Sequence, residues 1–402
     1  RTQCQALKLR WAWLDTAADA SIQSAWKGLR SRRLEREALV AAFPTVMVMG
    51  EREEPRVTHV LNRGVYDAPG DVVEPGIPAA LGSLPEDAPK TRLALGRWLI
   101  APENPLTARV AVNRVWQMLF GAGIVSTVED FGSQGEWPSH PELLDWLAVE
   151  LVESGWDVKA LIKTIVTSAT YKQSSAATPD LLEADPENRL LSRGPRVRLP
   201  AESIRDQALA VSGLLHEDLG GPSVKPYQPA GLWTELSNWK AYKHDEGESL
   251  YRRSLYTFWK RTIAPPSMVA FDAAPRETCV VRETRTNTPL QALDLMNDVT
   301  YVEAARKLAE RMLHEGGDAP AERLGYGFKL ATAREPQPRE QEILLRGFQR
   351  YLDRYQTTPA DAKKLLSAGE STPDASIPAE ELAAYSAVSS MILNLDEVIT
   401  KE

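Results

Sequence analysis

The chain has 402 residues, of which 43% are hydrophobic and 25% charged, an ordinary composition for a folded protein of about two or three domains. Its net charge of −8 argues against broad nucleic-acid binding, because an acidic protein repels phosphate backbones. No apolar run approaches the roughly 18 residues of a membrane-spanning helix, so the sequence predicts no membrane span. The chain begins without a Met, and we expect it to be part of a longer precursor.

The N-terminal part of the chain is expected to pass from helix to strand to irregular structure. Residues 5–42 are rich in Ala, Leu, Arg and Glu, a composition that predicts helix. Two short β-branched runs, 45–51 and 56–64, predict a β-hairpin across a charged turn. Residues 66–89 contain so many prolines and glycines that we expect an extended segment without regular structure.

From residue 91 onward the pattern predicts mostly helix. Asn104 before Pro105 is typical of a helix start, and Gly121 of its end. Asp157 is expected to cap a helix with one apolar face, and Asp298 to cap another near the C-terminal third. Further helices are predicted at 91–101, 141–153, 198–215, 288–297, 319–333, 338–356 and 378–400, with a flexible loop before the last.

Residues 254–262 alternate and are aromatic, so we expect a strand that joins the early hairpin. The predicted fold class is therefore mainly α: a multi-helix domain with a small antiparallel β-sheet and long loops rich in proline and glycine. The two cysteines, Cys4 and Cys279, can pair or stay free, and their spacing does not decide. The sequence has no C-x-x-C-H, C-x-x-C or H-E-x-x-H motif, so we expect no cofactor and no metal in this chain.

The first candidate site combines a helix face with the loop that follows it. Arg109 and Asn113 are four residues apart and share a helix face, and such side chains bind carboxylate, sulfate or sugar hydroxyls. Glu129 and Asp130 have the chemistry of an acid and a base for glycoside hydrolysis, and Trp137 that of a stacking surface for a sugar ring. The alternative, which we favour, is that Arg109 and Asn113 hold the loop backbone and pair with its acids.

His140 stands beside this loop and has two interpretations. One is a general base or a metal ligand. The other is structural, because Ser139 followed by Glu142 matches a capping box with Pro141 in the first turn. That match makes His140 the first helical residue, where a positive charge is disfavoured. We favour the structural interpretation.

The second candidate site is a predicted helix N-terminus, where free N–H groups attract anions. Four polar residues crowd it: Arg282, Arg285, Asn287 and Thr288. Gln291 is placed to complete a capping box with Thr288. The site suits a sulfate or a sugar acid. The alternative is that an acid of the chain itself, such as Asp272 or Glu277, occupies it.

Several long strings resemble one family. They include EDFGSQGEWPSHPELLDWL (129–147), DPENRLLSRGPRVRLPAESIRDQALAVSGLL (185–215) and RTNTPLQALDLMND (285–298). From about Thr91 to the C-terminus the chain resembles the planctomycete PSD family, the domain of unknown function fifteen-fifty-three. The resemblance implies three segments: 1–44 as the helical tail of a preceding domain, 45–90 as hairpin and extended chain, and 91–402 as the helical domain.

The same resemblance implies an extracytoplasmic setting, as the C-terminal part of a secreted protein. It implies two upstream partners in the full-length protein, a c-type cytochrome module and another uncharacterised domain, with haem c on the cytochrome module only. It also suggests a sulfatase-like partner protein and a link to polymer breakdown. It supplies no activity and no catalytic residues.

We therefore expect a binding or scaffold domain beside a c-type cytochrome module, with a carbohydrate or another polymer-derived anionic ligand. The alternative is an enzyme acting on polysaccharide, either a haem-coupled oxidoreductase or a lyase or hydrolase. No Gly-x-Ser-x-Gly elbow supports a serine hydrolase, and the sequence leaves open whether the chain is an enzyme. An enzyme should gather its polar candidates around one pocket: Arg109, Asn113, Glu129, His140, Arg285 and Asn287.

Overall fold

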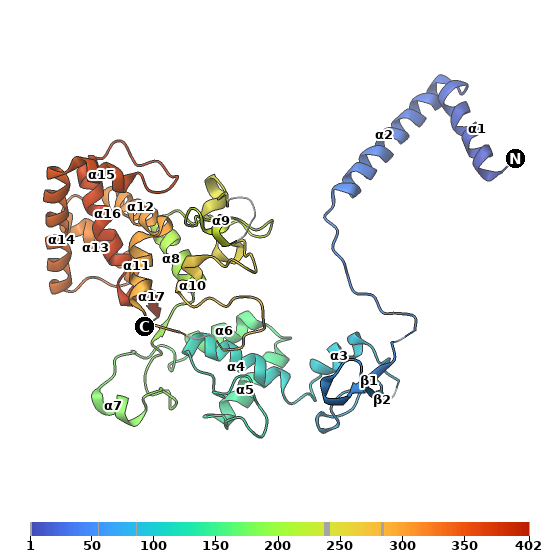
Figure 1. Ribbon diagram of the computed structural model, residues 1–402, viewed down its shortest axis with the longest axis horizontal. Helices are drawn as coiled ribbons and strands as arrows, with labels where there is room; N and C mark the ends of the chain where they lie inside the picture. The colour runs from blue at the N-terminus through green and yellow to red at the C-terminus, as the bar shows by residue number, and fades with distance from the viewer. Residues whose placement is uncertain (1, 55, 86, 237–241, 283–284, 402) are drawn as a thin grey trace. The chain divides into compact units, whose positions relative to one another are not determined.

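The computed structural model describes residues 2–54, 56–85, 87–236, 242–282 and 285–401. The chain divides into two compact units, Arg1–Arg97 and Trp98–Glu402. The described residues are mainly helical, and their two sheets have two antiparallel strands each (Figure 1). The predicted fold class is confirmed.

The first unit begins with two helices where the sequence predicts one. Helix α1 spans Gln3–Thr16 and α2 spans Ala20–Ala42. The chain breaks between them, where Asp19 takes the N-cap position of α2 and Ala18 is buried. The side chains of both helices are otherwise mostly exposed, so the pair contributes little core to this unit.

The predicted hairpin is wrong in one of its strands. Strand β1 (Thr58–Leu61) pairs antiparallel with β2 (Pro69–Val73), so the partner comes from the segment expected to be irregular. Pro69 stands at the first position of β2, where a missing N–H is tolerated, and Val72 and Val73 favour strand. Residues 45–51 form no strand, and Pro55 of the predicted turn lies outside the described residues. The unit continues through the short η1 (Asn62–Gly64) and η2 (Ala79–Leu81) to α3 (Arg92–Leu99).

The second unit contains two hydrophobic cores. The first lies among α4 (Thr107–Phe120), α5 (Pro141–Glu153) and α6 (Val158–Thr167). Trp116 and Phe120 stack in it with ring centroids 4.1 Å apart. Two predicted boundaries are confirmed here: Gly121 ends α4 in the left-handed conformation, and Asp157 accepts hydrogen bonds as the cap of α6. The start of α4 is two residues later than predicted, since Asn104 accepts from the N–H groups of Leu106 and Thr107.

The larger core surrounds α16 (Ala379–Leu393), whose side chains are buried on most of its circumference. A helix apolar on all sides is expected at the centre of a bundle. Asp298 caps α12 as predicted. One helix that the sequence did not predict, α15, precedes the loop predicted before α16 and ends at its second residue. The helices of this bundle are α8 (Ala201–Ser212), α11 (Pro289–Asn297), α12 (Val299–Glu315), α13 (Pro320–Thr332), α14 (Pro338–Thr357), α15 (Pro359–Leu366) and α17 (Asp396–Ile399).

Residues 254–262 do not form the predicted strand, and they do not join the hairpin. They begin as a short 3-10 turn, η4 (Ser254–Tyr256), followed by isolated bridges such as Val224 with Thr257. The backbone here is paired by turns and bridges instead of by a sheet: the Val224 N–H donates to the Tyr256 carbonyl at 2.8 Å, and the Ser254 N–H donates to the carboxylate of Asp206 at 2.7 Å. The buried Arg205 on α8 donates to the carbonyls of Leu250 and Arg252. Tertiary contacts thus override a local strand pattern.

The remaining elements of the second unit are short. The small sheet pairs β3 (Val197–Arg198) with β4 (Thr400–Lys401). Across the described residues, every helix is too short or too polar to cross a membrane. The short helices are α7 (Pro179–Ala184), α9 (Leu232–Leu236), η3 (Gly247–Tyr251) and α10 (Pro266–Ala270).

Candidate functional site

The loop between α4 and α5 is held in a single conformation by one buried amide. Asn113 is fully buried, and its side chain both donates to the carbonyl of Val125 and accepts from the Val125 N–H, each at 2.9 Å. Gly123 lies against this amide, where a Cβ would come within 2.6 Å of Asn113 Nδ2. In the structure Asn113 supports the loop backbone, as in the favoured interpretation.

The tip of the same loop is built around Thr127. Its hydroxyl donates to the carbonyl of Asp130 and accepts from the N–H of Glu136. Asp130 accepts from the N–H of Gly132 at 2.7 Å, and Gly135 packs so closely that a Cβ would lie 2.2 Å from the Asp130 carbonyl oxygen. This is the construction of a compact Ω-loop, a class of loop that often carries function.

A second ordered loop spans 185–196, between α7 and β3. The buried carboxylate of Asp185 accepts from the N–H groups of Arg189 and Leu190. Asn188 adopts a left-handed conformation and exchanges hydrogen bonds with the backbone of Arg193. The guanidinium of Arg193 in turn donates to the carbonyls of Asp185 and Pro186.

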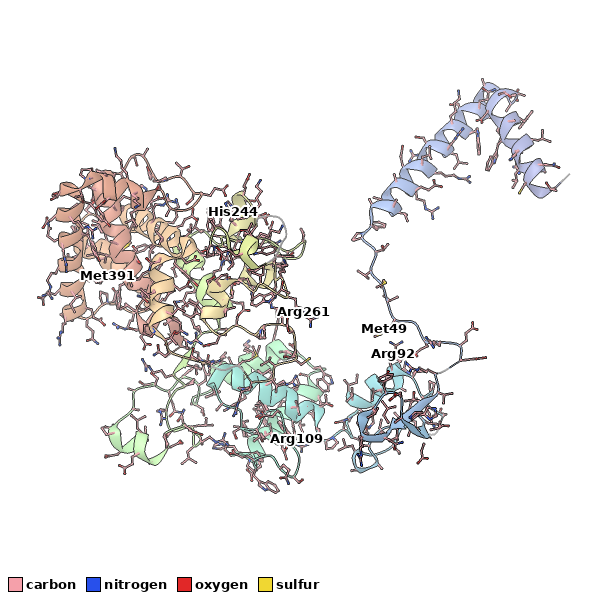
Figure 2. The ribbon with its side chains drawn as sticks, in the orientation of Figure 1. Met49, Arg92, Arg109, His244, Arg261 and Met391 are labelled. Atoms are coloured by element: carbon pink, nitrogen blue, oxygen red, sulfur yellow. The ribbon has the colours of Figure 1, made fainter. Side chains whose placement is uncertain are left out.

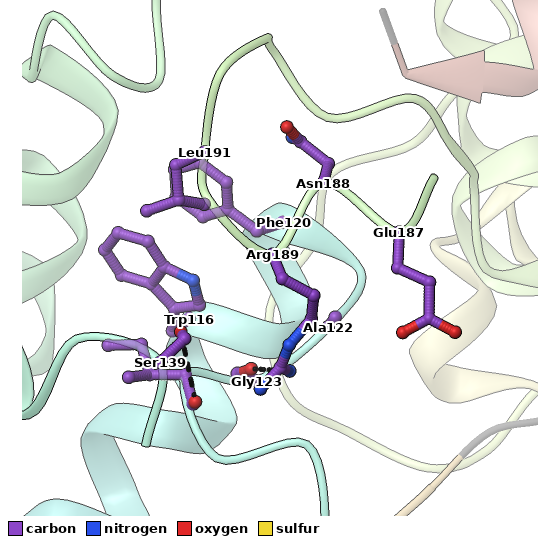
Figure 3. Close-up of a pocket in the computed structure, with 10 residues that line it drawn as sticks. Trp116, Phe120, Ala122, Gly123, Ser139, Glu187, Asn188, Arg189 and Leu191 are labelled. Atoms are coloured by element: carbon purple, nitrogen blue, oxygen red, sulfur yellow. Dashed lines mark hydrogen bonds between the residues drawn. The ribbon is translucent and has the colours of Figure 1, made fainter. Parts of the chain in front are cut away.

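The two loops meet, together with one residue from a third segment. Arg189 donates to the carbonyl of Gly123 at 3.2 Å (Figure 3). It also lies 3.6 Å from the carboxylate of Glu136. Glu136 also accepts from the hydroxyl of Ser126, whose carbonyl accepts from Arg282 at 3.3 Å. We call this site the loop junction, defined as residues 123–137 with Arg189 and Arg282.

The surface of the loop junction carries an unusually exposed aromatic ring. The side chain of Trp137 is 90% exposed, although it follows Glu136 directly on an ordered loop. Behind the junction, Trp116, Gly123, Ser139 and Arg189 line a cavity of about 20 Å³, which is room for about one water molecule (Figure 3). A ligand would therefore bind on the surface of the junction and not inside it.

The remaining candidates of the first site lie in separate contacts. Arg109, labelled in Figure 2, pairs with Asp145 of α5 at 2.6 Å and not with the acids of the loop. Glu129 is exposed at the loop surface. The predicted capping box is wrong: His140 itself is the N-cap of α5, without a side-chain cap bond, and its ring contacts the Ser139 hydroxyl. Ser139 is drawn away from the helix because it donates to the carbonyl of Ile124.

At the second candidate site, an acid of the chain contacts the segment that leads into the helix. The carboxylate of Asp272 accepts from the N–H and the hydroxyl of Thr286 and pairs with Arg198 at 2.5 Å. Gln291 is buried, accepts from the Thr288 N–H at 3.4 Å and donates to the carbonyl of Ala270. Asn287 is exposed, and Arg285 lines a cavity of only about 10 Å³ beside Asp272.

Taken together, these contacts place the six polar candidates in several separate networks. The cavity that Arg285 lines contains none of the other five. The loop junction brings Glu129 and Asp130 onto the same loop as Trp137, and it adds Arg282 from the second candidate site. Its other members, Ser126, Glu136 and Arg189, were not predicted.

The comparisons with known proteins agree with the resemblance seen in the sequence. The family model described as "Protein of unknown function (DUF1553)", PSD1, matches residues 91–348. The chain belongs to this family. No curated protein and no solved structure matches the chain. The matched region of this PSD1 protein includes every residue of the loop junction.

A pair of buried acids in the PSD1 domain was not predicted from the sequence. Asp294 of α11 has a buried carboxylate oxygen without a partner among the described residues. Burial, together with the charge of Asp298 four residues along, raises the pKa of Asp294 to about 7. The pKa of Asp298 is raised as well, mainly by burial. The i, i+4 spacing of these acids was visible in the sequence, but their burial was not.

A second buried network of the PSD1 domain centres on Glu303 of α12. Its Oε1 accepts from the hydroxyl of Tyr251 at 3.0 Å and from the N–H of Ser371 at 2.7 Å. Arg306 lies 3.6 Å from Glu303 and donates to the carbonyl of Ser371. Gly369 packs on the carboxylate itself, where a Cβ would lie 2.2 Å from the Glu303 carboxyl carbon. Burial beside Glu303 raises the pKa of Tyr251 to about 12.

Among the described residues, no group of three or more His, Cys, Asp or Glu is placed to hold a metal ion. Cys4 and Cys279 are both free and exposed. The chemistry of the loop junction is accordingly that of hydrogen-bond donors, carboxylates and one exposed indole ring.

Proposed function

We propose that this chain is a binding domain whose loop junction holds a carbohydrate or another polymer-derived ligand with anionic groups. The observation that carries the proposal is Trp137, whose side chain is 90% exposed beside an ordered cluster of charged and polar groups. An exposed indole on a rigid loop has no packing role that explains it. Aromatic faces of this kind stack on the apolar faces of ligand rings.

The polar groups beside Trp137 match such a ligand. Arg189 and Arg282 supply planar guanidinium groups, which suit the carboxylate of a sugar acid or a sulfate ester. Glu136 is largely exposed and can accept hydrogen bonds from sugar hydroxyls. The loops are held by buried amides and close glycine contacts, so little ordering entropy is lost on binding.

The same contacts favour binding over catalysis. A general acid or base must hold or release a proton at the substrate. The carboxylate of Glu136 is already engaged by Ser126 and Arg189, and Asp130 is engaged by a backbone N–H. These groups are set to hold a ligand in place.

The direct test is a glycan-binding screen that includes sulfated and uronic-acid oligosaccharides, performed with the full chain. A hit from this screen should bind the Trp137→Ala variant at least about fivefold more weakly, since stacking on one ring is worth about 1 kcal/mol or more. The matched control is Trp146→Ala, because Trp146 is half-exposed on α5 outside the junction. The control should keep the affinity of the wild type.

Two results would contradict the proposal. One is a screen without any carbohydrate ligand. The other is a ligand whose affinity falls equally in Trp137→Ala and Trp146→Ala, which would indicate a general loss of fold.

The wider setting is proposed from the family resemblance. We propose that the chain functions outside the cytoplasm as part of a longer secreted protein, with haem c on an upstream cytochrome module and another domain between them. A sulfatase-like protein that releases or modifies the same polymer is the proposed separate partner. Purification of the full-length protein tests the proposed cytochrome module, because haem c would give it a visible absorption spectrum.

A further inference from the structure

The largest described cavity of the second unit is an open groove of about 660 Å³. It lies on the side of the 185–196 loop that faces residues 174–177, and it does not include Trp137. This volume is in the usual range for small-molecule sites, roughly 300–1,000 Å³. The lining combines hydroxyl, amide and aromatic groups with two cations and one acid: Phe120, Ser174, Ser175, Glu187, Asn188, Arg193 and Arg196.

The walls of the groove are fixed by backbone contacts. Gly194 donates to the carbonyl of Ser174 at 2.8 Å, which joins the two sides. A Cβ on Gly194 would lie 2.3 Å from the Gln173 carbonyl oxygen, so this approach requires glycine. The side chain of Gln173 bonds the carbonyl of Leu191 across the same gap. The groove therefore exists before any ligand arrives.

Arg193 places a positive charge in the wall of this groove. Arg193 is only 8% exposed, and its guanidinium donates hydrogen bonds to the carbonyls of Asp185 and Pro186. Within the described part of the chain it forms no ion pair, and the carboxylate of Asp185 is taken up by two backbone N–H groups. Buried charges in proteins are normally paired with an opposite charge.

Arg252 is a second buried arginine of the same unit and can be compared with Arg193. It is also 8% exposed and also donates to loop carbonyls, those of Asp218, Gly220 and Pro222. Its charge, however, lies over the ring of Tyr256, with 3.9 Å from the guanidinium carbon to the ring centroid. Arg252 also lines none of the cavities described here. Arg193 differs in that it lines a groove of ligand size.

We propose that this groove binds the anionic group of a polar ligand, a carboxylate, sulfate or phosphate, with its charge directed at Arg193. The hydroxyls of Ser174 and Ser175 supply further hydrogen bonds, and Phe120 an apolar contact. The site is separate from the loop junction and does not require Trp137. It gives the protein a second binding site whose specificity is set by charge.

The test uses calorimetric titration of the full chain at low salt with three probes: a sulfated disaccharide, its unsulfated parent and inorganic sulfate. Ser175→Glu adds a carboxylate to the groove, and Ser175→Gln is the matched neutral control of the same size. The sulfated disaccharide should bind Ser175→Glu at least about tenfold more weakly than Ser175→Gln, because the added charge opposes the anion. Arg193→Gln should lose the same binding, and Arg252→Gln, which removes a similar loop support, should retain it.

The outcomes are separable. Inorganic sulfate binding as tightly as the sulfated disaccharide identifies a free anion as the ligand, and tighter binding of the disaccharide identifies a sugar-borne anion; both support the site. Equal affinity for the unsulfated parent, or equal affinity of Ser175→Glu and Ser175→Gln, overturns it. In the Trp137→Ala background, Ser175→Glu should still bind the sulfated disaccharide at least about tenfold more weakly than Ser175→Gln, so failure of the groove and failure of the loop junction are distinguishable.

Discussion

Replacing Asp294 by Asn should make the protein more stable at pH 8 and leave its stability unchanged at pH 4. Asp294 has a buried carboxylate oxygen without a partner, and its pKa is raised to about 7 from 3.8. The folded protein therefore holds this proton more tightly than the unfolded chain does. Stability is unaffected by Asp294 below about pH 4, falls as the pH rises through the range from about 4 to about 7, and stays lowered above it.

The size of the effect follows from the same pKa. Each pH unit between the folded and unfolded pKa is worth about 1.4 kcal/mol, which gives an upper limit of about 4 kcal/mol at pH 8. Because Asp294 is only partly buried, solvent screening reduces this, and we expect a gain of about 2 kcal/mol for Asp294→Asn.

Urea unfolding of both proteins at pH 4, 6 and 8 measures the difference. The contrasting variant is Asp298→Ala, which removes the side-chain oxygen that accepts from the Thr300 N–H at the cap of α12. A gain for Asp294→Asn that is the same at all three pH values would refute the reasoning, because it would not come from the proton.

Two further predictions concern packing. Asn113→Leu should lower the free energy of unfolding by about 3 kcal/mol, because it leaves the N–H and the carbonyl of Val125 buried without partners; an unchanged urea midpoint would contradict this. Gly369→Ala should cost about 3 kcal/mol by thermal or urea unfolding, because a Cβ would overlap the Glu303 carboxyl group at a φ of +82°. Its control, Gly28→Ala, lies on the exposed α2 with no atom within 4 Å of the new Cβ and should raise helix stability by about 1 kcal/mol.

The helical part of the fold was predictable because its signals are local. Gly121, Asp157 and Asp298 mark helix ends through the conformation or hydrogen bonds of single residues, and the structure places them as predicted. The strands were not predictable in this way. Thr58–Leu61 had two β-prone segments as possible partners, and residues 254–262 bond instead to Val224 and to Asp206 of α8, both more than 30 residues away. Neither choice is encoded within a window of ten residues or so.

One part of the loop junction was predictable because its contacts are local in sequence, and the other part was not. Asn113 and Val125 are close in sequence, and a buried loop needs such a partner, so the support role could be foreseen. Arg189 is 66 residues from Gly123, and no periodicity connects the two. The capping box at Ser139 failed because Ile124 competes for the same hydroxyl.

Two buried acids of this domain lie away from its cavities. Asp294 and Glu303 lie in packed helical contacts, whereas the acids that line the cavities described above are Glu187, Glu202 and Asp272. Trp137 is exposed and Arg193 lines the groove, and under the binding proposal this ring and this cation hold a ligand without transferring a proton. If the chain did catalyse a reaction, the proton would have to come from an exposed acid on these loops, such as Glu136. Glu136→Gln would then abolish turnover, whereas under the binding proposal it changes affinity alone.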